Sequence, residues 1–506
     1  MHVRSRHVQL RLPAGSARRW HLDLAERLSA LPGVSVSIAL AAPRRTGVEA
    51  SYQRVLGAER LMHGVRPRLA AAASDGDLAP WLGGTDRPTL VIAPEGSDSK
   101  EPGESGEGSD LWQLTFDGHP GTTGALAALA EGRFPLTRLT RGEERLATGR
   151  PGSERPGVLT AALEDVLAGS LLLVEQAVAG RLPIPPAAEP SPRPAAPSPS
   201  VSRTVAFAGL HRAYRMAYRA PHWRVGWRLL GSEQSPDVLD LLDHPETGWS
   251  TLPDDGVHFY ADPFPVAVGD QHVLFVEDFD HRLGRGVISA VEFGDHGPLG
   301  RPRPVLRHNT HLSYPFVLRA EGEWWMIPET SGAGTVELYR ALDFPDRWQR
   351  ETILLRDLTA SDVSVVHDQG RWWMFATVRH GGSWSDALHL WSADRLTGPW
   401  RPHPGNPVLL DITSARPAGR PVRRDGRLLR PVQDGSAGYG GGLAIAEVTR
   451  LDDTGFDQRV LARLGPGPLW PGSRLHTLNR AGRLECIDGS ARSPRFRRPS
   501  TDRGRS

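Results

Sequence analysis

One sequence pattern occurs five times between residues 258 and 490, and it constrains the fold more than any other feature. Each copy has a polar residue before a short apolar strand, then a Gly or Asp turn, then a second apolar strand. The polar residues that head the copies are Asp262, Tyr314, Asp362, Arg416 and His476. A β-rich repeat of roughly fifty residues is typical of a propeller with one small antiparallel sheet per blade. The sequence therefore predicts an all-β five-bladed β-propeller.

The residues that head the copies also predict a site. They begin the five innermost strands, so we expect them to converge on one mouth of the propeller channel. Carboxylates and His suit sugar hydroxyls, and Arg416 suits an anionic group such as a phosphate or a carboxylate. In the alternative interpretation these groups only satisfy one another, with Asp262 or Asp362 paired to Arg416.

The second strands of the first four copies end at equivalent positions. Glu277, Glu329, Thr377 and Gln433 each lie seven residues after the turn residue, and Asp434 follows Gln433. Glu277, Gln433 and Asp434 are expected to contribute to ligand binding, together with Tyr314, Arg416 and His476. For Glu277 and Glu329 a structural hydrogen-bonding role is the alternative. One Trp of each pair, 324–325 and 372–373, is expected to pack between blades and the other to face elsewhere, because neighbouring residues of a strand face opposite sides. A platform for a sugar ring is the alternative role of these Trp residues.

Length and composition indicate a soluble protein of several domains. The chain has 506 residues, of which 39% are hydrophobic and 23% charged, and its formal net charge is +2, which gives no argument for a nucleic-acid partner. A single cysteine, Cys486, excludes an intrachain disulfide and a multi-thiolate metal site. We expect no cofactor and no metal, since the spacing of the carboxylates supports no cation site. The apolar segment 161–178 contains three acidic residues, so we expect no transmembrane segment and a cytoplasmic location.

Shifts in composition divide the chain. Residues 1–182 alternate strands and helices, which predicts an α/β domain with a largely parallel sheet. Residues 183–204 are rich in Pro, Ala and Ser and are expected to form an extended linker. The propeller is expected to occupy residues 205–491, with residues 222–230 as its lead-in or closing strand. Residues 492–506 form a basic tail that we expect to be disordered.

Specific segments of the propeller region resemble a known family. They include ADPF (261–264), HLSYPFV (311–317), MIPETSGAGTVELYRA (326–341) and GRWWMFAT (370–377). Residues 220–490 resemble the N-terminal domain of glucosamine inositolphosphorylceramide transferase, and less closely the five-bladed propellers of glycoside hydrolase families 43, 62, 32 and 68. The resemblance implies a carbohydrate-binding or carbohydrate-processing protein of bacterial glycan or glycoconjugate biosynthesis. The transferase module of the plant enzymes has no counterpart here, so their activity is not implied.

The glycosidase resemblance implies particular catalytic carboxyls. Those enzymes place a base or nucleophile Asp in the first blade, a second Asp in the third and an acid Glu in the fourth, because the mechanism needs carboxyls in different protonation states. Asp262 and Asp362 match the two Asp positions. The fourth copy offers Arg416 instead of a Glu, so Glu329 of the second copy is the candidate acid.

Three functions are therefore open. The leading hypothesis is a propeller that binds a sugar or glycoconjugate, with or without a phosphate group, at the channel mouth. The second is an active glycoside hydrolase or glycosyltransferase that uses Asp262 and Asp362 with Glu329. The third is a non-catalytic scaffold for protein partners that the sequence does not identify.

The N-terminal part carries a weaker resemblance. Residues 111–142 resemble the strand, loop and helix around the active site of a Rossmann-like, formyltransferase-type fold. That family uses an Asn, a His and an Asp, whereas this segment has Asp117 and His119 without the Asn-x-His spacing. We therefore expect a degenerate, formyltransferase-like domain, in which residues 93–110 form a mobile polar loop.

Overall fold

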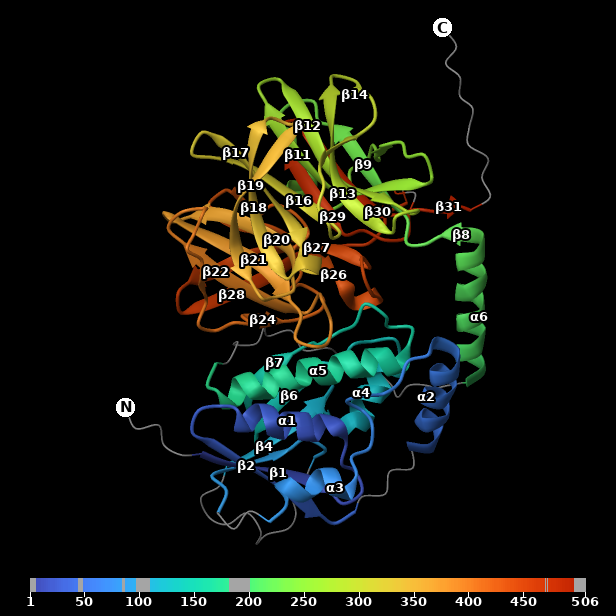
Figure 1. The fold of residues 1–506 in the computed structure, drawn as a ribbon, viewed down its shortest axis with the longest axis vertical. Coiled ribbons are helices and arrows are strands. Elements are labelled where there is room, and N and C mark those ends of the chain that lie inside the picture. The colour runs from blue at the N-terminus through green and yellow to red at the C-terminus, as the bar shows by residue number, and fades with distance from the viewer. Residues whose placement is uncertain are drawn as a thin grey trace.

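The computed structural model describes residues 6–43, 49–83, 87–96, 110–181, 201–468, 470 and 472–495. An α/β part at the N-terminus packs below a β-propeller, and one helix stands along the side of both (Figure 1). Most of the predicted linker (residues 183–200), the centre of the predicted mobile loop (97–109) and the end of the tail (496–506) lie outside the described residues.

The N-terminal part is a mixed α/β domain. Its described strands form a seven-stranded sheet in the order β2-β1-β3-β4-β6-β7, with β5 paired to β4. The strands are β1 (Arg6–Pro13), β2 (Val34–Ala41), β3 (Leu90–Ala93), β4 (Asp110–Phe116), β5 (His119–Pro120), β6 (Thr137–Arg141) and β7 (Glu144–Gly149). The pairs β1–β2, β1–β3 and β3–β4 are parallel, whereas β4–β6 and β6–β7 are antiparallel. The predicted parallel sheet is thus present in four strands only. β6 and β7 are antiparallel because the short turn between them has no room for a crossover.

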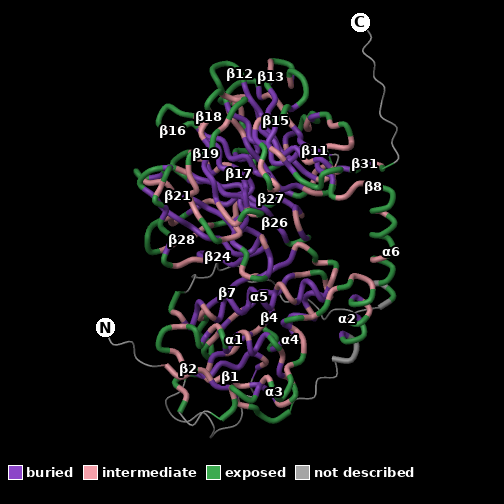
Figure 2. The backbone as a smooth tube through the Cα atoms, viewed as in Figure 1, coloured by how far each residue is buried: buried purple, intermediate pink, exposed green. Residues whose placement is uncertain are grey.

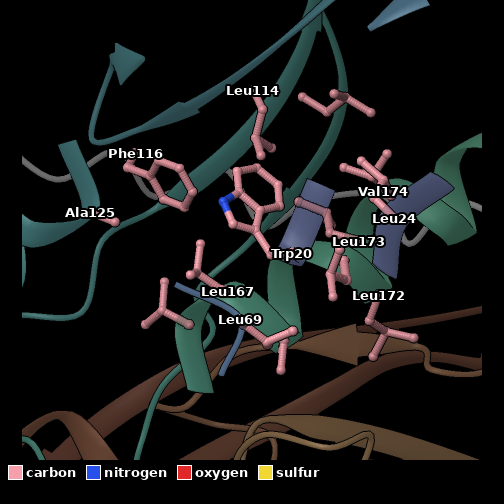
Figure 3. Packing of buried hydrophobic residues seen from close by; sticks show 14 of the residues in the cluster. Trp20, Leu24, Leu69, Leu114, Phe116, Ala125, Leu167, Leu172, Leu173 and Val174 are labelled. Carbon is pink, nitrogen blue, oxygen red and sulfur yellow. The ribbon is translucent and has the colours of Figure 1, made fainter. Parts of the chain in front are cut away.

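Helices cover this sheet and connect it to the propeller. They are α1 (Arg19–Ser29), α2 (Glu49–His63), α3 (Asp75–Leu78), the 3-10 turn η1 (Ala79–Trp81), α4 (Gly121–Ala130) and α5 (Leu159–Val178). Trp20 of α1 fills the centre of the core, between Leu114 and Phe116 of the sheet and Leu167 of α5 (Figure 3). The same apolar cluster includes Ala387, Leu410 and Ile412 of the propeller. The two parts therefore share one apolar core.

α5 is buried on nearly all sides because it lies between the N-terminal sheet and the propeller (Figures 1 and 2). This position explains its apolar sequence. Within the described residues, no helix combines the length and the hydropathy needed to cross a membrane.

Most described strands after residue 217 form five antiparallel blade sheets, as the repeat predicts, and β8 and β31 form a separate two-stranded sheet. The first four blades follow chain order. Blade 1 holds β11 (His258–Val268), β12 (Gln271–Asp280), β13 (Arg285–Gly294), β14 (Gly297–Pro298) and β15 (Arg303–Leu306). Blade 2 holds β16 (Ser313–Ala320), β17 (Glu323–Thr330), β18 (Thr335–Asp343) and β19 (Arg347–Arg356), with the 3-10 turn η2 (Ser331–Ala333) between β17 and β18. Blade 3 holds β20 (Ala360–Asp368), β21 (Arg371–Val378), β22 (Ala387–Ala393), β23 (Arg401–Pro402) and β24 (Leu409–Leu410). Blade 4 holds β25 (Val422–Arg424), β26 (Arg427–Asp434), β27 (Gly442–Asp452) and β28 (Gly455–Leu464), with η3 (Gly435–Ala437) after β26.

Blade 5 closes the ring with strands from both ends of this region. It combines β29 (Thr477–Ala481) and β30 (Leu484–Ser490) with β9 (Trp223–Leu229) and β10 (Ser250–Thr251). β9 pairs antiparallel with β30, so the strand expected at residues 222–230 is the closing strand. The short helix α7 (Val238–Leu241) lies between β9 and β10 in the sequence.

Two predicted boundaries differ from the structure. Helix α6 (Val201–Ala217) begins inside the segment expected to be an extended linker, because the last proline of that segment is Pro199 and the residues after it can continue a helix. Residues 492–495, expected to be disordered, contain β31 (Ser493–Pro494), which pairs with β8 (Tyr218–Arg219). The guanidinium of Arg219 holds this strand through the Pro494 carbonyl at 3.0 Å.

The Trp pairs divide their roles as their alternation in the strand predicts. Trp325 and Trp373 are buried in apolar clusters that include residues of neighbouring blades. Trp324 is only partly buried and stacks on Phe344, with ring centroids 4.4 Å apart. The innermost strands are the most deeply buried part of the propeller (Figure 2).

Candidate functional site

Three of the residues that head the repeats share one unusual backbone conformation. Asp262, Tyr314 and Asp362 have φ angles of 49°, 44° and 53°. Each lies in a β-bulge, where the register between the first and second strand of its blade shifts. Positive φ is strained for residues with a side chain, and bulges are common beside functional sites. The repeat alignment therefore identified equivalent positions in the first three blades.

Carboxylates accept the backbone N–H groups at these bulges. The N–H of Asp262 donates to Asp488 Oδ2 at 2.8 Å, and that of Tyr314 donates to Asp262 Oδ2 at 3.1 Å. The N–H of Asp362 donates to Glu329 Oε2, also at 3.1 Å. Leaving a buried N–H without an acceptor costs about 1–3 kcal/mol, so these acids join blade 5 to blade 1, blade 1 to blade 2 and blade 2 to blade 3.

Asp262, His476 and Asp488 form the first of two charged groups. The His476 ring places Nδ1 2.7 Å from Asp488 Oδ1 and Nε2 3.4 Å from Asp262 Oδ1. Thr477 adds a hydroxyl bond to Asp262 Oδ1 and an N–H bond to Asp488 Oδ1, both at 2.8 Å. Burial lowers the pKa of His476, but the two carboxylates outweigh it and raise the pKa to about 9. His476 is therefore an imidazolium at neutral pH, and Trp223 stacks on it with centroids 4.1 Å apart.

The same three residues are the candidate for a cation site in the described part of the chain. Each offers one ligand atom, and these atoms lie within 4.8 Å of one another. A metal ligand must be a neutral imidazole with a free nitrogen lone pair. Here both ring nitrogens face carboxylate oxygens, which fits a bridging imidazolium better than a metal ion. The expectation that no metal binds stays a prediction.

Asp362 and Arg416 form the second charged group. Asp362 Oδ2 accepts a hydrogen bond from Arg416 Nε at 2.5 Å and another from Gln433 Nε2 at 2.8 Å. Arg416 Nη1 also donates to Ser385 Oγ at 3.1 Å, and the guanidinium lies 5.1 Å from the centre of the Tyr439 ring. The Asp362–Arg416 pairing considered as an alternative to ligand binding is therefore present.

Burial and pairing oppose each other in this group. Burial raises the pKa of Asp362, the Arg416 charge lowers it, and the result is a pKa of about 6. Burial lowers the pKa of Arg416, but Asp362 and other groups around it raise it above the ordinary value. Arg416 thus stays charged, while Asp362 can gain a proton at mildly acidic pH.

Glu277 and Glu329 differ in their surroundings. Burial first, and then the charge of Asp262 and the other acids of the site, raise the pKa of Glu277 well above its ordinary value, which favours its protonated form. His311 Nε2 lies 3.5 Å from Glu277 Oε1. In Glu329 both oxygens accept hydrogen bonds, Oε1 from Ser331 Oγ at 2.6 Å and Oε2 from the N–H of Asp362. Glu277 rather than Glu329 is therefore placed to donate a proton.

Two predicted ligand residues have other partners. Tyr314 is fully buried, and its hydroxyl lies 2.9 Å from Ser364 Oγ and 3.3 Å from the carbonyl oxygen of Gly419, so it forms the floor of the site. Asp434 accepts hydrogen bonds from Arg463 Nη1 at 2.6 Å and from the N–H of Ser436 at 3.0 Å, which places it at the rim.

Sequence reasoning missed Asp488 and Ser385. Asp488 lies in the second strand of the fifth copy, but the spacing that aligns the first four copies leads there to its neighbour Gly489. Ser385 lies in the loop between β21 and β22, which has no equivalent in the repeat. No sequence signal singles it out.

Comparison with known proteins supports the resemblance for the propeller. Residues 250–481 match the family described as "Glucosamine inositolphosphorylceramide transferase 1, N-terminal". The match covers somewhat less than half of the chain. A rice protein (Oryza sativa subsp. japonica) named glucosamine inositolphosphorylceramide transferase 1 is 34% identical over 233 residues, which is 44% of this chain and 31% of the rice protein. The Arabidopsis thaliana protein of the same name is 33% identical over 199 residues, 38% of this chain and 26% of its own length. The chain thus spans less than a third of these relatives.

Solved glycoside hydrolases are similar at low sequence identity. Zg3597, a family 117 glycoside hydrolase of Zobellia galactanivorans, matches with a TM-score of 0.35 and 11% identity over 53% of this chain and 90% of its own. The β-xylosidase RS223 matches with a TM-score of 0.34 and 11% identity over 41% of this chain and 77% of its own.

The two N-terminal candidates lie apart from this site. Asp117 Oδ2 accepts a hydrogen bond from Arg133 Nη1 at 2.7 Å, and Oδ1 accepts one from the N–H of Leu136 at 2.8 Å. His119 is exposed in β5. Asp117 thus has a structural role at a turn with a φ of 48°, and the formyltransferase-like character of this domain stays a prediction.

Proposed function

We propose that the propeller binds a sugar or glycoconjugate, with or without a phosphate group, at the face formed by the charged residues. The protein would act in the assembly of a glycan or glycoconjugate. The observation that carries the proposal is an excess of buried acids. Among the described residues, the face buries the acids Asp262, Glu277, Glu329, Asp362 and Asp488 with the cations His476 and Arg416. Burying acids without matching cations is costly, and such clusters with perturbed pKa values are typical of functional sites.

The chemistry of these groups suits a polyhydroxylated ligand. Carboxylates accept hydrogen bonds from sugar hydroxyls, and a protonated carboxyl, the form that burial favours at Glu277, can donate one as well as accept one. The guanidinium of Arg416 can bind an anionic substituent. The match of residues 250–481 to a domain of proteins named as glucosamine inositolphosphorylceramide transferases supports the same class of ligand.

Glu277 is the residue with which to test this proposal. Asp262 is less suitable, because its carboxylate also accepts the Tyr314 N–H and the Thr477 hydroxyl, so a loss of binding could follow from local unfolding. We expect Glu277→Ala to weaken sugar binding about tenfold, since a buried hydrogen bond to a ligand contributes roughly 1–2 kcal/mol. Its thermal midpoint should not fall, because the substitution removes a buried acid.

The measurement is a glycan array followed by calorimetry on the full chain. The full chain is needed because both parts share one core. Glu447→Ala is the matched control, since this acid pairs with Arg427 and Arg459 on the outer strands of blade 4. If the wild type binds no sugar on the array or in calorimetry, the proposal is wrong.

Catalysis is the second candidate, and the raised pKa of Glu277 favours it. A neutral carboxyl can protonate the oxygen of a leaving group, while Asp262 or Asp362 supplies the carboxylate that the mechanism also needs. Glu329, the acid expected from the sequence, accepts hydrogen bonds through both oxygens. Glu277→Gln mimics the neutral acid without its transferable proton, so it should retain sugar binding and abolish any hydrolysis or transfer. Equal turnover by Glu277→Gln and wild type would exclude Glu277 as the acid.

We also propose where the protein acts and what kind of domain its N-terminal part is. The setting is bacterial and cytoplasmic, and the N-terminal domain is a formyltransferase-like domain without activity. Its four parallel strands and the engagement of Asp117 by Arg133 support the second part. Assaying formyl transfer by the purified full chain tests it, and measurable transfer would contradict it.

A further inference from the structure

The segment between β7 and α5, residues 150–158, extends from the N-terminal domain onto the propeller. Arg150 forms a parallel bridge with Asp411, in which the N–H of Arg150 donates to the Leu410 carbonyl at 2.8 Å. The N–H of Ile412 donates back to the Arg150 carbonyl at 2.9 Å. A Cβ atom at Gly152 would lie 2.3 Å from Ile412 Cγ1, so the Gly152 backbone packs directly against the Ile412 side chain. The segment is therefore built into the propeller surface.

Glu154 of this segment anchors a propeller loop. Its Oε1 atom accepts three hydrogen bonds from the loop between β21 and β22. The donors are Ser383 Oγ at 2.7 Å, the N–H of Trp384 at 2.9 Å and Ser385 Oγ at 2.9 Å. One carboxylate oxygen of the N-terminal domain thus fixes the conformation of a loop that borders the charged face.

Ser385 connects this anchor to the charged face. A serine hydroxyl has one proton to donate and can accept through its lone pairs. Ser385 donates its proton to Glu154, so its lone pairs are oriented to accept from Arg416 Nη1 at 3.1 Å. The guanidinium is thereby held at two points, by Asp362 at Nε and by Ser385 at Nη1.

We propose that the ligand site is a composite of both domains, in which Glu154 is a positioning residue that acts through Ser385 on Arg416. The ligand class is a sugar that carries an anionic group, such as a phosphate monoester, which the oriented guanidinium recognises. This inference rests on the proposed ligand site at the charged face. It assigns the N-terminal domain a role in ligand binding that does not depend on any catalytic activity of that domain.

The structure offers a matched pair of serines for the test. Ser383 and Ser385 are both buried and donate to the same oxygen of Glu154, but only Ser385 contacts Arg416. Ser385→Ala therefore breaks the connection to the guanidinium. Ser383→Ala removes a similar bond to Glu154, together with the acceptor of the Ser385 N–H, but leaves the Ser385 hydroxyl that contacts Arg416. Ser385→Thr keeps the hydroxyl and serves as the rescue variant.

The experiment is calorimetry of the full chain with two probes, glucosamine 6-phosphate and glucosamine. We expect the wild type to bind the phosphorylated probe more tightly. Ser385→Ala and Glu154→Gln should each weaken that binding about three- to tenfold, the effect of one lost hydrogen bond, with little change for glucosamine. The double variant should be no weaker than either single one, because both act on one connection. Ser383→Ala and Ser385→Thr should bind as the wild type does.

The outcomes separate this inference from the proposed function. If the wild type binds and Ser385→Ala binds equally well, or if Ser383→Ala weakens binding as much, the composite site is wrong and the propeller site stands. If the wild type binds neither these probes nor any sugar on the array, the proposed function fails and the inference with it.

Discussion

Replacing Arg416 by Met would remove the cation of the buried pair on which the charged face depends. Asp362 and Arg416 are 3% and 7% exposed, and Nε and Oδ2 are 2.5 Å apart, so solvent screens this interaction little. Removing one partner of such a pair leaves a buried charge and costs about 3–5 kcal/mol. Met fills part of the volume of the Arg side chain, so the loss of stability comes mainly from the missing charge.

The loss of stability caused by Arg416→Met should grow as the pH rises. The folded-state pKa of Asp362, about 6, is above the ordinary value of 3.8, so this group favours the folded state most below the ordinary value and less as pH rises through 6. Without Arg416, which lowers this pKa, the pKa of Asp362 rises further. The variant therefore keeps losing stability with rising pH after the wild type has stopped doing so. The difference in the free energy of unfolding between wild type and variant should be small at pH 4–5 and complete at pH 8.

Urea unfolding of the full chain, followed by Trp fluorescence at pH 5 and pH 8, measures this deficit. Arg459→Met is the control, because it removes a guanidinium from an exposed pair with Glu447 and should change little at either pH. An equal deficit for Arg416→Met at both pH values would refute the pairing argument. So would a deficit no larger than that of the control.

Three further predictions concern the contact between residues 150–158 and the propeller, and the charged face. Burial raises the pKa of Asp386, which accepts the N–H of Gly152, to about 8, so stability should fall as pH rises from about 4 through 8. Asp386→Asn should flatten the pH dependence of the thermal midpoint between pH 5 and 8, and an unchanged slope would contradict this. Gly152→Ala should destabilise the protein by about 1–3 kcal/mol through overlap with Ile412, whereas Gly57→Ala, in an open part of α2, should not lower the thermal midpoint. The pKa of His476 is raised to about 9, so its stabilisation is complete below about 6.5 and lost as pH rises through 9. His476→Gln should therefore destabilise the protein more at pH 6 than at pH 9.5, which thermal unfolding at the two pH values checks.

Much of the propeller could be predicted because its signal repeats along the chain. The alternation of apolar strands and the recurring polar residue depend on local geometry, which is similar in each blade. Aligning the copies therefore placed Asp262, Tyr314 and Asp362 at equivalent bulges. The sequence left residues 222–230 open as the lead-in or the closing strand, and the pairing of β9 with β30 shows that they form the closing strand.

The state of each acid could not be predicted, because it depends on groups from other blades. Glu277 and Glu329 look equivalent in the repeat, yet the pKa of Glu277 is raised well above its ordinary value by burial and neighbouring acids, whereas Glu329 accepts two hydrogen bonds. The difference comes from partners such as Ser331 and the Asp362 N–H, whose proximity is a property of the folded ring.

The contribution of the N-terminal domain was also outside the reach of sequence reasoning. Glu154 lies in a loop with no motif, and it meets Ser385 across 231 positions of the chain. Contacts of this kind are set by how the two parts dock, and docking depends on the shape of both surfaces. Periodicity within either part carries no information about it.

A crystal structure of the full chain soaked with the sugar that binds most tightly tests the central claim most directly. We expect electron density for the sugar at the charged face, with a hydroxyl within hydrogen-bond distance of Glu277 and an anionic group, where present, on Arg416. Density for the sugar at a different place, such as the cleft lined by Arg68, Glu164 and Arg379, with the charged face unchanged, would contradict the account.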